Sequence, residues 1–198
     1  GDVEFFSIEQ MAQSFSLERV NPNPARFDVK KCTAINGDWI RYLAIDDLVK
    51  RLVPYLQRDG VIGSTPSAED MNLVRAVVPL ISERLETLGQ ASAMVGFLFT
   101  DDIAIDATDA EKIMGDQADD VLQAAEAALA GLDEWTTESI ERALRAALID
   151  ERGLKPKVAF GPVRLAVTGR RVSPPLFESM ELLGADRSLD RIRSLHAS

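Results

Sequence analysis

Basic side chains and proline-fixed turns gather in the last quarter of the chain. Residues 155–195 contain Gly161-Pro-Val-Arg-Leu-Ala-Val-Thr-Gly169, Ser173-Pro-Pro-Leu176 and Leu182-Leu-Gly184. Residues 151–198 hold nine Lys and Arg against five Asp and Glu, whereas the whole 198-residue chain has a formal net charge of -10. A basic end on an acidic body produces a focused field that can steer a polyanion to one surface. A solvated charged face is the simpler interpretation, so charge alone leaves both interpretations open.

Arg84 is an arginine at the edge of a predicted apolar helix face. It lies beside Ile81 and Leu85, at the edge of an apolar stripe, where a guanidinium can emerge at a crevice. The planar group suits the edge of a cytosine or guanine and stacks on any base. From the residues alone, a surface arginine that pairs with Glu83 or Glu86 is the favoured interpretation.

The signatures of most catalytic sites are missing. The chain has no glycine-rich phosphate loop, and neither a nucleophilic triad nor a zinc site can be built from His196 and Cys32, its one histidine and its one cysteine. We expect His196 to lie in a frayed tail. The acidic cluster in 101–109 lacks the spacing of an EF-hand, so a solvated turn with helix caps is the better interpretation.

Composition also limits the setting in which the protein works. No apolar run approaches the roughly 18 residues of a membrane span. The acidic N-terminus lacks the basic start of a secretory signal, and a single cysteine fits a reducing cytoplasm.

The hydrophobic pattern predicts an almost entirely helical chain. Ser7–Gln10 and Thr108–Glu111 have the pattern of a capping box, and Ser67 caps a further predicted helix. Asn36-Gly37 is expected to end a short helix that begins after Asp28. The apolar stripe of the helix after Ser67 consists of Met71, Val74, Val78, Ile81 and Leu85, spaced as one helical face.

Other segments predict connections or leave two structures open. Residues 60–66 are the best candidate for a linker. Further helices are expected at 46–57, around Ile140–Leu148, at 176–183 and at 186–195. The alternation of Val163, Leu165 and Val167 is by itself compatible with a strand.

The basic blocks, in their order along the chain, resemble the C-terminal anticodon-binding region of bacterial glutamyl-tRNA synthetases. Phe27–Leu43 is similar to the segment that precedes this region in the same family, more than a hundred residues upstream. The resemblance implies an all-α fold in which two packed helical anticodon-binding subdomains, 49–100 and 101–198, follow the end of a stem-contact region, 1–48. It also implies a helix at 163–167.

The resemblance implies a set of residues that contact tRNA. In similar enzymes an arginine at the position of Arg84 touches the last anticodon base. Arg164 matches the arginine of the family pattern Pro-x-Arg-x-Ala-x-Thr-Gly, and the residues that follow match a loop that cradles unstacked bases. The implied tRNA-binding residues are Arg84, Arg164, Ser173, Pro174 and Leu176.

Several positions depart from the family pattern or remain open. The usual Thr-Pro-Gly-Leu is Ser-Pro-Pro-Leu here, so Pro175 stiffens the loop and removes one N–H. For Arg170 and Arg171, phosphate contact and a solvated turn are equally favoured. Trp39 and Tyr42 can stack on RNA, but aromatic residues at helical spacing are more often in a core.

The resemblance implies a piece of a larger enzyme, which charges tRNA with glutamate using ATP and Mg²⁺. The chain contains neither the HIGH nor the KMSKS signature of class I synthetases. We therefore expect an inactive, monomeric C-terminal part without a cofactor, whose partners are tRNA(Glu) and its own catalytic domain. The presence of Arg84 does not decide whether the parent enzyme also charges tRNA(Gln). The alternative function is an acidic helical module that docks another protein through 109–131, without RNA.

Overall fold

Helices form the regular structure of the computed structural model, which describes residues 6–20 and 26–196. Within those ranges no strand occurs, so the predicted all-α fold is confirmed. The α-helices are α1 (Ile8–Ser14), α2 (Val29–Tyr42), α3 (Ile45–Arg58), α4 (Ala68–Ile81), α5 (Ala91–Val95), α6 (Ala107–Ile113), α7 (Ala118–Ala130), α8 (Thr137–Leu144), α9 (Pro156–Thr168), α10 (Leu176–Leu183) and α11 (Ala185–His196). Shorter turns of helix are η1 (Leu17–Arg19), η2 (Ser82–Arg84), η3 (Leu88–Gln90), η4 (Gly96–Leu98) and the π-helix η5 (Arg145–Asp150).

The elements from α2 to η4, residues 29–98, make up what we call the first group. α3 packs against α4, and both contact α5, while α2 packs against η2. One face of α3 is buried and consists of Leu48, Leu52 and Leu56. They share this face because residues four apart lie on the same side of a helix. The predicted cap of α4 is confirmed, since the Ser67 hydroxyl accepts from the Asp70 amide at 3.0 Å.

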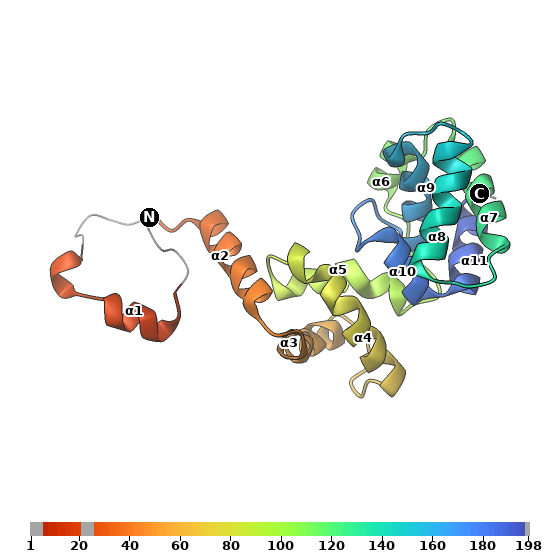
Figure 1. Cartoon of the computed structure of the whole chain (residues 1–198). Coiled ribbons are helices and arrows are strands. Elements are labelled where there is room, and N and C mark those ends of the chain that lie inside the picture. The colour runs from red at the N-terminus through yellow and green to blue at the C-terminus, as the bar shows by residue number, and fades with distance from the viewer. Residues whose placement is uncertain (1–5, 21–25, 197–198) are drawn as a thin grey trace.

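The elements from α6 to α11, residues 107–196, make up the second group. Its centre is formed by α7, α9 and α11, which contact one another in pairs, and α8 with α10 closes one side. Figure 1 shows this group as a bundle, with α10 nearest to the first group. Both of the last two helices were correctly predicted, including the Gly184 stop between them.

The two groups share an interface and a continuous hydrophobic core. α10 contacts α4 and η4, and α9 contacts η4. Buried side chains from both groups belong to one cluster, which includes Ile81 in the first and Met180 in the second. The division into subdomains at residue 100 stays a prediction.

The helix that starts after Asp28 is longer than predicted, because Asn36-Gly37 does not end it. α2 continues to Tyr42, and both residues instead make a close contact with the chain after η2. A Cβ at Gly37 would lie 3.4 Å from the Cα of Glu86, and the side-chain amide of Asn36 donates to the Glu86 carbonyl at 2.5 Å. The glycine therefore permits a close approach between two segments rather than a helix stop.

Two further boundary predictions were wrong. Asp106, not Thr108, caps α6, and its carboxylate accepts from the Asp109 amide at 2.9 Å. Aspartate is one of the preferred N-cap residues, so the helix begins after Asp106 and Thr108 lies inside it. Residues 60–66 are a turn inside the first group rather than a linker, because Ile62 is buried and the helices on either side pack together.

The alternation of Val163, Leu165 and Val167 belongs to a helix, as the family resemblance implied. All three side chains are fully buried in α9. A helix surrounded by other helices is apolar on every side, so its sequence can show an alternation that is typical of a strand.

The predicted Ser7–Gln10 capping box is present at the start of α1. Two predictions about single side chains were wrong. Tyr42 is 73% exposed and stacks edge-on against Trp39, so it is not a core residue. His196 is not frayed: its Nε2 lies 2.9 Å from the Glu126 carboxylate.

Candidate nucleic-acid interface

Arg84 and Arg164 come from different groups and converge on one loop. Arg84 is the last residue of η2, where it follows α4, and Arg164 lies in α9. Arg164 donates to the Ser173 hydroxyl at 2.6 Å and to the Pro174 carbonyl at 2.8 Å. Arg84 donates to the Ser173 carbonyl at 3.2 Å. Two arginines that are far apart in the sequence thus bond to the same residue, Ser173, of the loop before α10.

The local sequence makes this loop turn back on α9. Gly169 ends α9 with a φ of 74°, in the left-handed region that glycine adopts without strain. Thr168 follows Arg164 by one turn, donates to its carbonyl and accepts from the Arg170 amide. Ser173 is buried, and its hydroxyl also bonds to the Pro174 carbonyl at 3.0 Å. The loop is therefore fixed by internal bonds before any ligand arrives.

The guanidinium groups of Arg84 and Arg164 lie close together, because both bond to Ser173. Burial, and then the charge of Arg84, lower the pKa of Arg164, and only the charge of Glu178 acts in the opposite direction. Among the described residues no ion pair involves Arg84 or Arg164, so the alternative pairing of Arg84 with Glu83 or Glu86 is not observed. Like charges that are left together favour the approach of an anion.

The other residues expected at this site differ in exposure. Leu176 is 3% exposed and belongs to the hydrophobic core beneath the loop, and Pro174 is also buried. Pro175 precedes α10, and its carbonyl accepts from the Ser179 amide and hydroxyl. We call Arg84, Arg164, Ser173 and Pro174 the arginine cluster. Of these residues, Arg84 is the most exposed.

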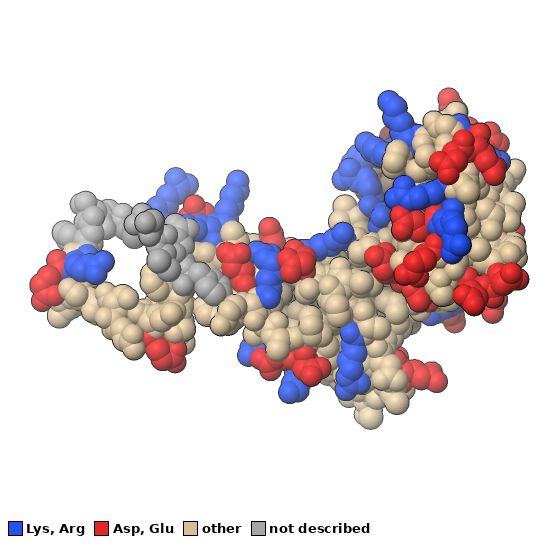
Figure 2. Space-filling model, in the orientation of Figure 1, with Lys and Arg blue, Asp and Glu red and all other residues tan. Residues whose placement is uncertain are grey.

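A groove of about 1130 Å³ continues from Arg164 along α9. Three more cations, Lys112, Lys157 and Arg171, line it together with one acid, Asp116. Its apolar lining includes Ile113, Val158 and Phe160. Figure 2 shows blue side chains on the flank of the second group that faces α2, with red ones on the opposite side.

Sequence reasoning missed Lys112 and Lys157 as members of this surface. Lys112 lies in α6, within a segment rich in acidic residues, and Lys157 lies far downstream in the first turn of α9. They line one groove because α6 packs against α9. No local pattern could have joined them.

Several cations of the C-terminal segment have internal roles. Arg193 pairs with Glu126 at 2.6 Å, and Arg191 is buried, donating to backbone carbonyls as Arg187 does. Arg171 binds Asp109 through its amide at 2.8 Å and its side chain at 3.5 Å. The net basic charge of residues 151–198 therefore overstates the charge that is free to act on a polyanion.

The described residues give no indication of a metal site or a membrane segment. Within them, no group of three or more His, Cys, Asp or Glu could hold a metal ion. Asp106 and Asp109 of the acidic cluster cap α6 and bind Arg171, respectively. No helix in the same ranges is long and apolar enough to cross a membrane.

A family model described as "Anticodon binding domain" matches residues 47–195. The chain belongs to this family. The two groups of helices described above, from α3 onward, therefore make up an anticodon-binding domain. Arg84, Arg164 and the loop at 173–174 all lie inside the matched range.

Curated relatives of the anticodon-binding domain are glutamate–tRNA ligases. The chain is 52% identical to that of Saccharopolyspora erythraea over 194 residues and 51% identical to that of Kineococcus radiotolerans over 199 residues. These matches cover 98% and 100% of this chain. The chain spans about two fifths of their length, 39% and 40% respectively.

Solved structures show the same fold at lower identity. A glutamate tRNA ligase from Elizabethkingia meningosepticum matches with a TM-score of 0.78 and 19% identity, over 98% of this chain and 37% of that one. The glutamate-tRNA synthetase of Elizabethkingia anophelis matches with a TM-score of 0.76 and 20% identity, over 98% of this chain and 36% of that one. The same arrangement of helices thus recurs in these two structures.

Proposed function

We propose that the chain is the anticodon-recognising part of a glutamate–tRNA ligase and that it binds tRNA(Glu). The observation that carries this proposal is the convergence of Arg84 and Arg164 on the loop at Ser173–Pro174. The curated relatives are glutamate–tRNA ligases, and the chain covers the part of them that corresponds to an anticodon-binding domain. In the whole enzyme, another part would bind ATP, Mg²⁺ and glutamate.

The arginine cluster has the properties needed to read unpaired bases. Sequence-specific recognition of RNA mostly targets unstacked bases, through hydrogen bonds to their edges and stacking on aromatic or guanidinium planes. Arg164 is held by two bonds from one nitrogen, so its remaining N–H groups are oriented in advance. Arg84 uses one long bond and is otherwise exposed. Orienting both groups before binding lowers the entropic cost of the complex.

The groove along α9 would hold the sugar-phosphate backbone of the RNA whose bases contact Arg84 and Arg164. Its cations are spaced around an apolar floor that includes Phe160, which can contact one base face while phosphates meet the charges. Phosphate contacts add affinity without sequence information, whereas base contacts at the arginine cluster supply the specificity. The proposal thus assigns different roles to two adjoining surfaces.

The experiment that tests this function compares RNAs by filter binding at several salt concentrations. The purified chain should bind tRNA(Glu) more tightly than the same tRNA with a substituted anticodon, and affinity for both should fall with salt. Equal binding of the two RNAs would refute anticodon recognition. No binding to either at low salt would favour the alternative, a module that docks a protein through residues 109–131.

Removing the charges of the groove should weaken all RNAs alike. The double variant Lys112→Gln, Lys157→Gln should reduce the slope of log K against log salt by about two, one for each phosphate that is no longer neutralised. The preference for the correct anticodon should not change, because neither lysine touches the loop at 173–174. The matched control is Lys50→Gln on α3, outside the groove, which should leave the slope unaltered. An altered anticodon preference with an unchanged slope would contradict this assignment.

A further inference from the structure

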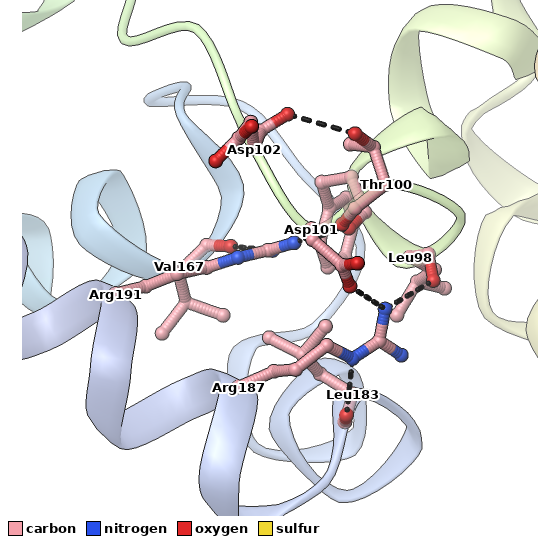
Figure 3. A network of polar contacts seen from close by, with 9 residues as sticks. Leu98, Thr100, Asp101, Asp102, Val167, Leu183, Arg187 and Arg191 are labelled. Atoms are coloured by element: carbon pink, nitrogen blue, oxygen red, sulfur yellow. Dashed lines mark hydrogen bonds and ion pairs between the residues drawn. The ribbon is translucent and has the colours of Figure 1, made fainter.

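Two arginines of α11 hold the segment that connects the first group to the second. Arg191 donates to the Phe97 carbonyl at 2.9 Å, to the Thr100 carbonyl at 2.5 Å and to the Val167 carbonyl at 2.7 Å. Arg187 donates to the Leu98 carbonyl at 3.0 Å. Figure 3 shows both guanidinium groups reaching from α11 to this segment. We call these contacts the α11 latch.

The latch satisfies carbonyls that have no helical partner. Phe97 and Leu98 are the last two residues of η4 and Thr100 lies beyond it, where the chain leaves the first group; Leu98 is 1% exposed. Unpaired carbonyls in such a place cost free energy, and a planar guanidinium can donate to several of them at once. Arg191 is itself only 7% exposed, so its bonds form away from competing water.

Each guanidinium group also donates to the second group through a different nitrogen. Arg191 bonds to Val167 in α9, and Arg187 bonds to the Leu183 carbonyl at the end of α10 at 3.2 Å. Arg187 in addition lies 3.9 Å from Asp101, whose side chain is exposed. The latch therefore joins η4, α9, α10 and α11, and it spans the connection between the groups.

The candidate interface depends on the relative orientation of the two groups. Arg84 belongs to the first group, whereas Arg164 and Ser173 belong to the second, and Arg84 reaches Ser173 with a single bond of 3.2 Å. That bond is too weak to set the orientation alone. Val167, which the latch holds, lies in the same helix as Arg164, less than one turn farther on.

We propose that Arg187 and Arg191 are positioning residues for RNA binding. Together with the packing of α10 against α4 and η4, they fix the orientation of the first group relative to the second, so that Arg84 meets Arg164 at one loop without either latch arginine touching the RNA. The consequence for RNA rests on the proposed function, whereas the consequence for orientation does not. Two experiments separate these parts.

The first experiment measures orientation without RNA. Spin labels are attached to Cys32, which is exposed on α2 of the first group, and to a cysteine introduced in α8 of the second (Glu138→Cys). The distance distribution between the labels should broaden or shift in Arg191→Met. It should stay unchanged in Arg193→Met, which removes the same charge from the same helix but from a pair with Glu126 inside the second group. An unchanged distribution in a folded Arg191→Met variant would overturn the proposal.

A milder variant protects the test from loss of folding. Arg191→Met leaves buried carbonyls without donors and can unfold the protein. Arg187 is half-buried, with 35% of its side chain exposed, so Arg187→Met should keep the fold and still alter the distribution. If Arg191→Met does not fold and Arg187→Met leaves the distribution unchanged, the proposal is wrong.

The second experiment asks whether the latch acts through Arg84. Arg187→Met should weaken binding of tRNA(Glu) roughly tenfold, because the two base-reading groups are no longer aligned. Adding Arg84→Ala to Arg187→Met should then weaken binding of tRNA(Glu) by a much smaller factor than Arg84→Ala does in the unaltered chain. Multiplicative effects would show that the latch and Arg84 act independently and would overturn the positioning role. If Arg84→Ala alone does not weaken binding, the proposed function fails, while the measurement with spin labels still tests the latch.

Discussion

Arg164→Ala is expected to raise the Kd for tRNA(Glu) about 5- to 150-fold, the equivalent of about 1–3 kcal/mol. The side chain loses its own contact with RNA and also releases the Ser173 hydroxyl and the Pro174 carbonyl, so the loop is no longer fixed. Arg84→Ala should have an effect of similar size. Filter binding with tRNA(Glu) and with an anticodon-substituted tRNA measures both changes, and the loss should be larger for the former.

Two control variants separate base contact from charge and from folding. Arg164→Lys keeps the charge but cannot reproduce a planar set of donors, so it should still weaken binding. Arg58→Ala removes an equal charge from an exposed pair with Asp59 and should have little effect. The assignment of the site is defeated if the Arg84→Ala, Arg164→Ala double variant melts normally and binds tRNA(Glu) as tightly as the unaltered chain.

Gly169→Ala is expected to lower the free energy of unfolding by about 2–4 kcal/mol. The residue has a φ of 74°, which is strained for any residue with a Cβ. A Cβ there would also lie 2.5 Å from the Ala104 carbonyl oxygen, so the backbone of residues 104–106 would have to move. The Asp106 amide donates to the Gly169 carbonyl at 3.0 Å, and that bond would be disturbed as well. Denaturant titration measures the loss.

Alanine substitutions at two other glycines separate the cost of the left-handed conformation from the cost of the close approach to Ala104. Gly153 has a φ of 66° but nothing within 4 Å of a Cβ, so Gly153→Ala should show only the cost of the left-handed conformation, about 1 kcal/mol. Gly131 has a negative φ and open space, so Gly131→Ala should change stability by less than about 0.5 kcal/mol. If Gly169→Ala costs no more than Gly153→Ala, the close approach to Ala104 is not important.

The sequence was sufficient to predict the helical fold and its later elements. The Ser67 cap and the Gly184 stop are local signals, and each acts within a few residues. The predictions at Asn36-Gly37 and Thr108 were wrong because the same residue types serve different purposes. Gly37 is a point of close approach to residue 86, which no local pattern reveals.

Arg84 and Arg164 were named from the sequence, but their geometry was not predicted, and their contact with RNA stays a prediction. The family resemblance supplied Arg84 and Arg164, and only the packing of the two groups brings them to one loop. Charge counting was misleading for Arg191, whose burial lowers its pKa to about 10 and leaves it charged at neutral pH, but as a structural donor. A sequence shows how many cations a segment has, but not which of them the fold uses.

The most direct test of the account follows the arginine side chains themselves. The chain is labelled with ¹⁵N and titrated with an RNA hairpin that carries the tRNA(Glu) anticodon, while the Nε–Hε signals of its arginines are recorded. We expect the signals of Arg84 and Arg164 to shift with RNA, whereas the signal of Arg58, which pairs with Asp59 at the end of α3, should not. Unchanged signals from Arg84 and Arg164 at saturating RNA, with shifts elsewhere, would contradict it.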